Sequence, residues 1–119
     1  MPYSPQKLHK KLLGNAGEKL VEAYLKKQGY AILKRNYRTP FGEADLIAKD
    51  KDEIAFIEVK TRTSDKYGTP REAVGADKQR RYRKIAQCYW KERGEEPNAR
   101  FDVAEVYADG TIEYFKNAF

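Results

Sequence analysis

The stretch that most restricts how this chain can fold is an apolar segment that ends in opposite charges. Residues 54–57 are all apolar, and they run directly into Glu58, Val59 and Lys60. Bulky and β-branched residues between polar turns predict a strand over residues 53–61. A carboxylate and an ammonium inside such a strand are costly unless they are paired, hydrogen-bonded or bound to a metal ion. We therefore expect this strand to end in either a structural ion pair or a functional site.

The preceding apolar segment, residues 43–49, carries an acid of its own, Asp45. Because side chains alternate across a strand, Glu58 and Lys60 lie on the same face of the strand over residues 53–61. Asp45 lies on the partly charged face of the strand over residues 43–49. If the connecting turn contains an even number of residues, the antiparallel register places Asp45, Glu58 and Lys60 on one face of the sheet. An odd number would separate them and remove the basis for a shared site.

Two acids and a lysine on neighbouring strands are the components of a metal-dependent phosphodiester-cleaving site. Carboxylate oxygens are hard ligands that suit Mg²⁺ or Mn²⁺. Asp45 and Glu58, with the backbone carbonyl of Val59, are the expected ligands, and Lys60 would orient the attacking water or stabilise charge on the phosphate. A Glu-x-Lys spacing alone occurs about once by chance in a chain this rich in both residues. From these residues alone, a metal site and a structural ion pair remain equally open.

The size and charge of the chain favour one domain, residues 1–119, with an acidic partner. A chain of 119 residues is long enough for a single core without disulfide or metal staples. Lys and Arg outnumber Asp and Glu by 24 to 18, which gives a net charge of +6. This balance favours nucleic acid as a partner first and an anionic membrane surface second.

Several classes of protein are disfavoured by what the sequence lacks. No apolar run is long enough to span a bilayer, and the N-terminus has no signal-peptide pattern. The single cysteine, Cys88, cannot form an internal disulfide and falls in a helical pattern, where a small core residue is expected. His9 is the only histidine, so a His/Cys zinc site is excluded. The sequence predicts a reduced, cytoplasmic protein that does not enter the membrane.

Hydrophobic periodicity predicts elements in the order α-β-β-β-α-β-β, a mixed sheet with helices. The first helix continues to about residue 28 and is ended by Gly29, but the pair Gly14 and Asn15 is either a weak point inside it or a fresh start. Strands are expected over residues 30–37, 43–49, 53–61, 100–107 and 111–115.

Between the third and fourth strands the pattern is again helical. Thr69, Pro70 and Glu72 form a helix-start signal after a loop at residues 63–69, and Gly75 interrupts the helix that they begin. A longer helix is expected over residues 77–93. Its buried face is predicted to contain Tyr82, Ile85, Ala86 and Tyr89.

Short motifs spread along the chain give it a family resemblance. They are Gly14-x-x-Gly17-Glu18, Asn36-Tyr37-Arg38, Gly42-Glu43-x-Asp45-Leu46-Ile47, residues 56–62, Lys78-Gln79 and Arg100-Phe101-Asp102. With these motifs the chain resembles the YraN-like family of small bacterial proteins, which is similar to the PD-(D/E)XK nucleases and to archaeal Holliday-junction resolvases. The resemblance implies an α/β restriction-endonuclease-like fold, in which an αβββαβ core has a mixed central sheet flanked by helices. It also implies Mg²⁺ dependence and a nucleic-acid substrate.

The resemblance assigns roles to particular residues. Asp45 matches the first acid of the nuclease motif, and Glu58 with Lys60 matches its acid-x-lysine. Ala44 stands where the motif has proline, a position that is loosely kept in this fold. Glu18 matches the first-helix glutamate of the resolvase-like branch, which supports the metal or its water.

Other polar residues have more than one interpretation. Lys78 and Gln79 fall where many such nucleases place an extra polar residue from the second helix. Glu18 follows Asn15 by three residues, so a helix-capping role competes with a role in the site. We favour an ion pair between Glu43 and either Arg62 or Arg38 over metal contact. The role of Asp102 is open, with Arg100 or a lysine on a neighbouring strand as candidate partners.

The basic residues provide a candidate surface for phosphate contacts. These residues are Arg62, Lys66, Arg80, Arg81, Arg83 and Lys84. The resulting hypothesis is a metal-dependent endonuclease that acts on branched or structured DNA. Cutting a four-way junction would need two sites and hence a homodimer. The alternative is a non-catalytic nucleic-acid-binding or partner-recruiting module that keeps the nuclease fold, and an RNA substrate also remains open.

Overall fold

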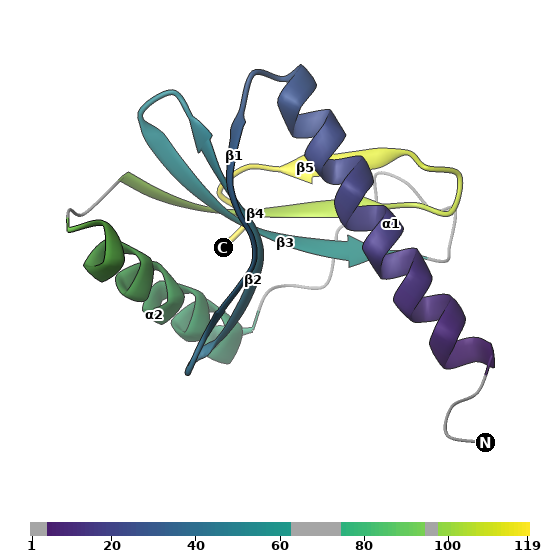
Figure 1. The fold of residues 1–119 in the computed structure, drawn as a ribbon, viewed down its shortest axis with the longest axis horizontal. Coiled ribbons are helices and arrows are strands. Elements are labelled where there is room, and N and C mark those ends of the chain that lie inside the picture. Colours follow the sequence, from purple (N-terminus) through teal and green to yellow (C-terminus); the bar gives the residue numbers. More distant parts are fainter. Residues whose placement is uncertain (1–4, 63–74, 95–97) are drawn as a thin grey trace.

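The computed structural model describes residues 5–62, 75–94 and 98–119, with the side chains of the first helix described from residue 16 onward. Two helices and five strands follow the predicted order (Figure 1). Their bounds are α1 Pro5–Lys27, β1 Ala31–Thr39, β2 Gly42–Asp50, β3 Glu53–Thr61, α2 Ala76–Arg93, β4 Asn98–Val106 and β5 Ile112–Phe115. The predicted loop at residues 63–69 and the helix start at Thr69, Pro70 and Glu72 lie outside the described residues.

The observed elements agree with the periodicity to within about two residues. Helix α1 ends at Lys27, and Gly29 follows with φ of 91°, a left-handed conformation that glycine adopts without steric cost. The N–H of Tyr30 then donates to the carbonyl of Leu25 at 2.9 Å, which closes the helix. Neither helix in the described ranges is long and apolar enough to cross a membrane.

The strands form one mixed sheet in the order β1-β2-β3-β4-β5. Strands β3 and β4 are parallel, and every other neighbouring pair is antiparallel. A parallel pair needs a long crossover, and α2 lies in the connection between β3 and β4. The sheet is therefore built from an antiparallel β1-β2-β3 meander that is extended by the parallel β4 and its hairpin partner β5.

The two helices cover opposite faces of the sheet (Figure 1). Alternation along β3 produces this arrangement, because Ala55 and Ile57 pack under α1 while Ile54 and Phe56 pack under α2. The α1 core includes Val21, Leu25 and Leu46. The α2 core contains Tyr82, Ile85, Ala86 and Tyr89, as predicted. Cys88 is a free and only half-buried thiol, so it is less enclosed than expected.

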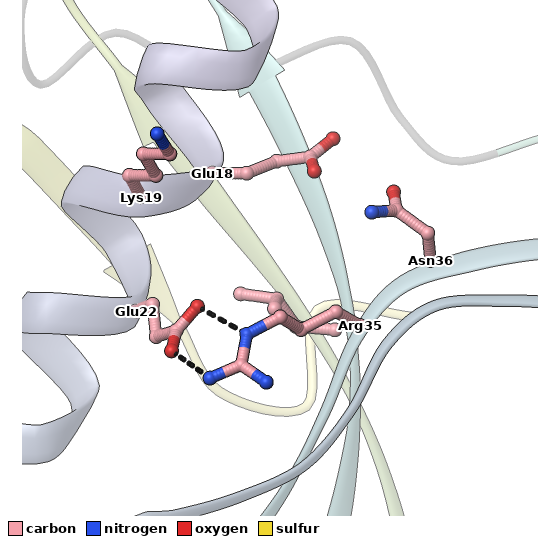
Figure 2. A pocket seen from close by; sticks show the side chains of 6 residues that line it. Glu18, Lys19, Glu22, Arg35 and Asn36 are labelled. Atoms are coloured by element: carbon pink, nitrogen blue, oxygen red, sulfur yellow. Dashed lines mark hydrogen bonds and ion pairs between the residues drawn. The ribbon is translucent and has the colours of Figure 1, made fainter.

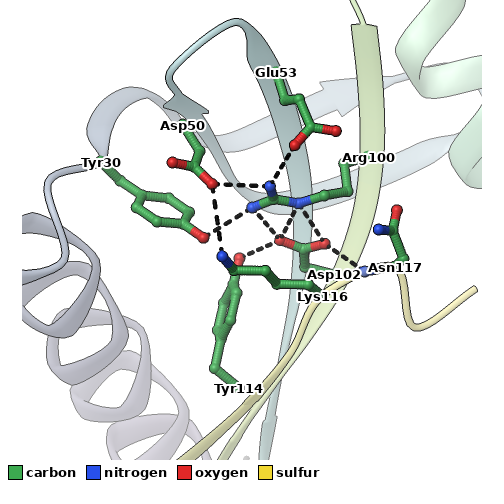
Figure 3. A network of polar contacts seen from close by, with 8 residues as sticks. All are labelled: Tyr30, Asp50, Glu53, Arg100, Asp102, Tyr114, Lys116 and Asn117. Atoms are coloured by element: carbon green, nitrogen blue, oxygen red, sulfur yellow. Dashed lines mark hydrogen bonds and ion pairs between the residues drawn. The ribbon is translucent and has the colours of Figure 1, made fainter.

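A buried charge network joins one end of the sheet to the C-terminal tail (Figure 3). Arg100 on β4 is 2% exposed and binds Asp102, which is fully buried, through Nε at 3.1 Å and Nη2 at 3.0 Å. Its Nη1 donates to Asp50 and to Glu53 at 2.9 Å each, and its Nη2 donates to the Tyr30 hydroxyl at 2.8 Å. These contacts tie the β2–β3 turn and the end of α1 to β4.

The same aspartate holds the end of the chain. The backbone N–H of Asn117 donates to Asp102 Oδ1 at 3.0 Å, and the Tyr114 hydroxyl donates to Oδ2. Both oxygens of Asp102 are thus used in internal hydrogen bonds. This answers the question that the sequence left open, because Arg100 is the ion-pair partner of Asp102 and the pair has a structural role.

Candidate active site

The turn between β2 and β3 has the even length that a shared site requires. Asp50 pairs with Glu53, so only Lys51 and Asp52 lie between the paired residues. This register pairs Ile47 with Phe56 in the α2 core, and Glu58 continues that face two residues after Phe56. Asp45 does not follow from alternation in the same way, because Ala44 and Ile47 both belong to the α2 core while Leu46 belongs to the α1 core. Lys60 follows Glu58 on the same face and is half-buried.

Strands β2 and β3 separate where the acids begin. Their pairing ends at Leu46 and Ile57, although β2 continues beside β1 and β3 continues beside β4. Asp45 lies one residue before Leu46 on β2, just beyond the last paired residue. Its Oδ2 accepts a hydrogen bond of 2.8 Å from the backbone N–H of Val59. The carboxylate therefore takes the place of a backbone carbonyl in the ladder and is held in the split between the two strands.

Burial and neighbouring acids raise the pKa of Asp45 to about 6. Desolvation is the largest cause, and the carboxylates of Glu18, Glu58 and Glu43 add to it, while the hydrogen bond from Val59 opposes it. A carboxylate in this position is easier to ionise beside a cation. Carboxylates from α1, β2 and β3 therefore lie close together at the point where β2 and β3 separate.

Glu18 reaches this region because α1 approaches β3 closely at Gly17. A Cβ atom at residue 17 would lie 3.1 Å from the Thr61 hydroxyl, so glycine permits the helix to come this near. Burial, and then the Glu43 carboxylate, raise the pKa of Glu18. Helix α1 begins at Pro5, so Asn15 lies inside the helix and the capping interpretation of Glu18 is wrong.

Asn36 links the acids of α1 and β2, a role that the sequence reasoning did not assign. On β1, Arg35 pairs with Leu46 and Tyr37 pairs with Ala44, so Asn36 lies opposite Asp45. Its φ of 49° is a left-handed value that asparagine tolerates better than most residues. With its amide nitrogen toward the acids, Asn36 donates to Glu43 at 3.0 Å and to Glu18 at 3.2 Å. The only sequence signal was its place in the Asn36-Tyr37-Arg38 motif.

An open pocket of about 310 Å³ lies beside these residues, between α1 and β1 (Figure 2). Glu18, Lys19, Glu22, Arg35, Asn36 and Leu46 line it. Glu22, one turn after Glu18 on α1, accepts two hydrogen bonds from Arg35, one of them at 2.9 Å. The bond to Arg35 is also the largest reason that the pKa of Glu22 falls to about 2. This pair fastens α1 to β1 next to the acids.

The second helix supplies a cation to the site. Lys78, in the first turn of α2, forms an ion pair with Oε1 of Glu58. The other oxygen of Glu58 is buried and has no hydrogen-bond partner in the described part of the chain. Lys78 thus stands where a polar residue from the second helix was expected. Its neighbour Gln79 is half-buried and donates its backbone N–H to the Gly75 carbonyl at 3.0 Å.

The donor set suits a hard divalent cation, although the acids are not gathered around one point. Among the described residues, no three Asp, Glu, His or Cys side chains form a cluster that could hold a metal ion. Asp45 and Glu58 nevertheless offer carboxylate oxygens on facing strands, and one Glu58 oxygen is buried without a partner. Mg²⁺ commonly uses one or two carboxylates and keeps several waters, so two acids and the carbonyl of Val59 are a fitting set.

The basic residues named from the sequence are distributed unevenly. Arg62 is bound by the buried Glu105, with hydrogen bonds of 2.9 and 2.6 Å, and Glu43 pairs with Arg38 at 3.5 Å, one of its two expected partners. The remaining described residues of the predicted basic surface are exposed on α2. They are Arg80, which pairs with Asp77, and Arg81, Arg83 and Lys84. Lys66 lies outside the described residues.

Comparison with known sequences places the chain in a family. Residues 17–106 match the family described as "Uncharacterised protein family UPF0102". The chain belongs to this family. A UPF0102 protein from Syntrophus aciditrophicus is 52% identical over 110 residues, which cover 89% of this chain and 87% of that protein. One from Desulfosudis oleivorans is 49% identical over 108 residues, covering 89% and 88%. The resemblance inferred from the motifs is confirmed.

Comparison with solved structures identifies the fold. The chain is similar to the structure of Archaeoglobus fulgidus Hjc, a Holliday junction resolvase from an archaeal hyperthermophile, with a TM-score of 0.53. The match covers 83% of this chain and 72% of that one at 21% sequence identity. The UPF0102 chain therefore has the restriction-endonuclease-like α/β fold that the motifs predicted.

Proposed function

We propose that this UPF0102 protein is a metal-dependent endonuclease that hydrolyses phosphodiester bonds in branched or otherwise structured DNA. One observation carries the proposal, namely the buried Asp45 held in the split between β2 and β3, where the nearby Glu58 carboxylate helps to raise its pKa. Burying several mutually repelling acids lowers stability, and a bound cation would offset that cost. The resolvase fold of the structural neighbour supports the same chemistry.

Each residue of the site has a distinct part in this proposal. Asp45, Glu58 and the carbonyl of Val59 would hold Mg²⁺ or Mn²⁺, which neutralises charge on the phosphate and acidifies a bound water. Lys60 would place its ammonium beside the phosphate under attack. Glu18, positioned by Asn36, would orient the water by hydrogen bonding. When the metal binds Glu58, Lys78 would leave that carboxylate and form an ion pair with a phosphate of the DNA backbone.

The choice of DNA as substrate rests on charge and on the structural neighbour. The exposed cations of α2 suit phosphate contacts. The neighbour from Archaeoglobus fulgidus is a Holliday junction resolvase, and a substrate with two strands to be cut requires two sites. We therefore propose that the active form on four-way DNA is a homodimer, with Mg²⁺ or Mn²⁺ as cofactor.

Cleavage assays with matched variants test this function. Purified protein is mixed with Mg²⁺ or Mn²⁺ and with linear, flapped and four-way DNA of the same sequence. We expect cleavage of the branched substrates, and a loss of about 100-fold or more for Asp45→Asn, Glu58→Gln and Lys60→Met. Asp52→Asn, in the exposed β2–β3 turn, is the control and should cleave normally. Cleavage that persists in Asp45→Asn would come from a contaminant and would remove the support.

A non-catalytic nucleic-acid-binding module is the second candidate. The ion pair between Glu58 and Lys78 favours it, because it satisfies one ligand oxygen without a metal. This candidate predicts salt-sensitive DNA binding, no cleavage of any substrate, and binding that tolerates Lys60→Met. RNA versions of the same substrates in the assay would show whether the sugar matters.

A further inference from the structure

An aromatic side chain is displayed at the tip of the β1–β2 hairpin. Among the described residues, the exposed large hydrophobic side chains are Leu20 and Phe41, at 42% and 43%. The turn that carries Phe41 is ordered by Thr39, whose hydroxyl donates to the Gly42 carbonyl at 3.0 Å and accepts from the Phe41 N–H at 3.0 Å. Phe41 is therefore a partly exposed ring on a fixed turn.

Basic residues of α2 lie beside this ring. Phe41 and four residues of α2, Asp77, Arg80, Arg81 and Lys84, line an open groove of about 440 Å³. The Lys84 ammonium lies 5.1 Å from the centre of the Phe41 ring. The single acid of the groove, Asp77, is already paired with Arg80. The groove thus combines an aromatic surface with excess positive charge, which suits a polyanion that also has flat apolar faces.

The groove continues from the proposed active site along two elements. On α2, Arg81 follows Lys78 by three residues, so both lie on the same side of the helix. Phe41, in the turn just before β2, precedes Asp45 by four residues, which is about 13 Å of extended chain. The start of β2 also packs against α2, since a Cβ at Gly42 would meet Ile85 at 3.6 Å. A strand of DNA bound at Asp45 would reach this groove within a few nucleotides.

We propose that Phe41 stacks on an unpaired DNA base and that Arg81 and Lys84 bind the adjacent phosphates, which makes the groove a single-strand site. Aromatic rings beside cations are a general means of holding single strands, because every base has a π-face. Bases inside a duplex are already stacked and cannot reach an exposed ring. The groove would thereby direct the protein to flaps, gaps and branch points. This inference rests on the proposed function in one respect only, namely that the groove lies beside the site of cleavage.

Binding without a divalent ion separates this proposal from cleavage. In EDTA, the affinities of the wild-type protein and of Phe41→Ala are measured for a single strand, a flap and a plain duplex. A 2-aminopurine in the single-stranded segment reports stacking through its fluorescence. We expect Phe41→Ala to lose about 10-fold in affinity for single-stranded and flapped DNA, with duplex affinity unchanged.

Two further variants complete the test. Leu20→Ala removes an equally exposed apolar side chain from α1 and should bind like the wild type. Phe41→Trp keeps a stacking ring and should retain affinity and 2-aminopurine quenching. The proposal is overturned if the wild type binds no single strand, if Phe41→Ala binds it normally, or if Phe41→Ala loses duplex and single-strand binding equally. A protein that shows the expected binding but never cleaves would refute the nuclease function and leave the single-strand site standing.

Discussion

Lys78 in the first turn of α2 is ion-paired with Glu58 on β3, which lies 20 positions earlier in the chain. The side chains of Lys78 and Glu58 are 32% and 13% exposed, so the pair is largely enclosed. The contact ties the start of α2 to the strand that carries the candidate ligands. It also makes the position of α2 sensitive to whatever else binds Glu58.

Replacing Lys78 by methionine should make stability depend on metal. Removing Lys78 leaves the largely enclosed Glu58 charge without its ion pair. We expect the free energy of unfolding in EDTA to fall by about 1–2 kcal/mol, a moderate loss because Lys78 is partly exposed. If Glu58 is a metal ligand, Mn²⁺ should restore more stability in Lys78→Met than it adds to the wild type. Denaturant titrations with and without Mn²⁺ measure both effects. Arg80→Met, which breaks an exposed pair with Asp77, is the control and should change stability by less than about 0.5 kcal/mol.

The contact between Glu22 and Arg35 predicts a particular pH dependence. The pKa of Glu22 is lowered to about 2, so its contribution is complete above its usual value and is lost as the pH falls toward 2. Glu22→Gln should be less stable than the wild type at about pH 7, by under 1 kcal/mol because Arg35 is exposed, and the difference should shrink below about pH 4.5. Urea titrations across this range measure it. A difference that grows on acidification would contradict the prediction.

Arg100 should matter for stability and not for the site. Asp102 is fully buried, so Arg100→Ala would leave its charge without its ion-pair partner, held by Tyr114 and Asn117, and should cost about 3–5 kcal/mol. The nearby Lys116, which is 59% exposed, is the control, and Lys116→Ala should cost less than about 0.5 kcal/mol. The network lies at the β2–β3 turn, away from Asp45 along the sheet. Nucleic-acid affinity per folded molecule should therefore be unchanged when Arg100→Ala is measured at low temperature.

A double-mutant cycle tests the close approach of α1 to β3. Alanine is favoured over glycine inside a helix by about 0.5–1 kcal/mol, yet Gly17→Ala would bring its Cβ to 3.1 Å from the Thr61 hydroxyl. We expect Gly17→Ala to destabilise the wild type and to stabilise the Thr61→Ala variant, where the next contact is Val106 at 3.7 Å. If Gly17→Ala changes the free energy of unfolding in the same direction in both backgrounds, contact with Thr61 does not decide the effect.

Local chemistry explains why the main features of the site were visible in the sequence. Alternation of side chains is a property of every extended strand, so it places Glu58 and Lys60 on one face wherever the strand lies. The turn of two residues sets the register of β2 against β3, but the place of Asp45 depends on the fold, because alternation is broken between Ala44 and Leu46. The end of α1 at Gly29 likewise depends on glycine alone. The Glu58-x-Lys60 strand was informative for this reason.

Other features depend on residues that are distant in the chain. No pattern near Asp102 distinguishes Arg100 from a lysine on a neighbouring strand, and no local rule shows that Asn36 faces Glu18. The periodicity of α1 does not decide between a cap and a site for Glu18, whereas the continuous helix does. These are questions of which groups packing brings together.

By itself, the sequence determined the order of the elements, the family and the shared face of Glu58 and Lys60, because each follows from short-range periodicity or from motif residues. Only the tertiary structure decided that β2 and β3 separate at Asp45, that burial raises the pKa of Asp45, and that Lys78 pairs with Glu58. The physical reason is that desolvation and charge pairing depend on distances across the folded chain. Such distances exist only once the helices have packed onto the two faces of the sheet.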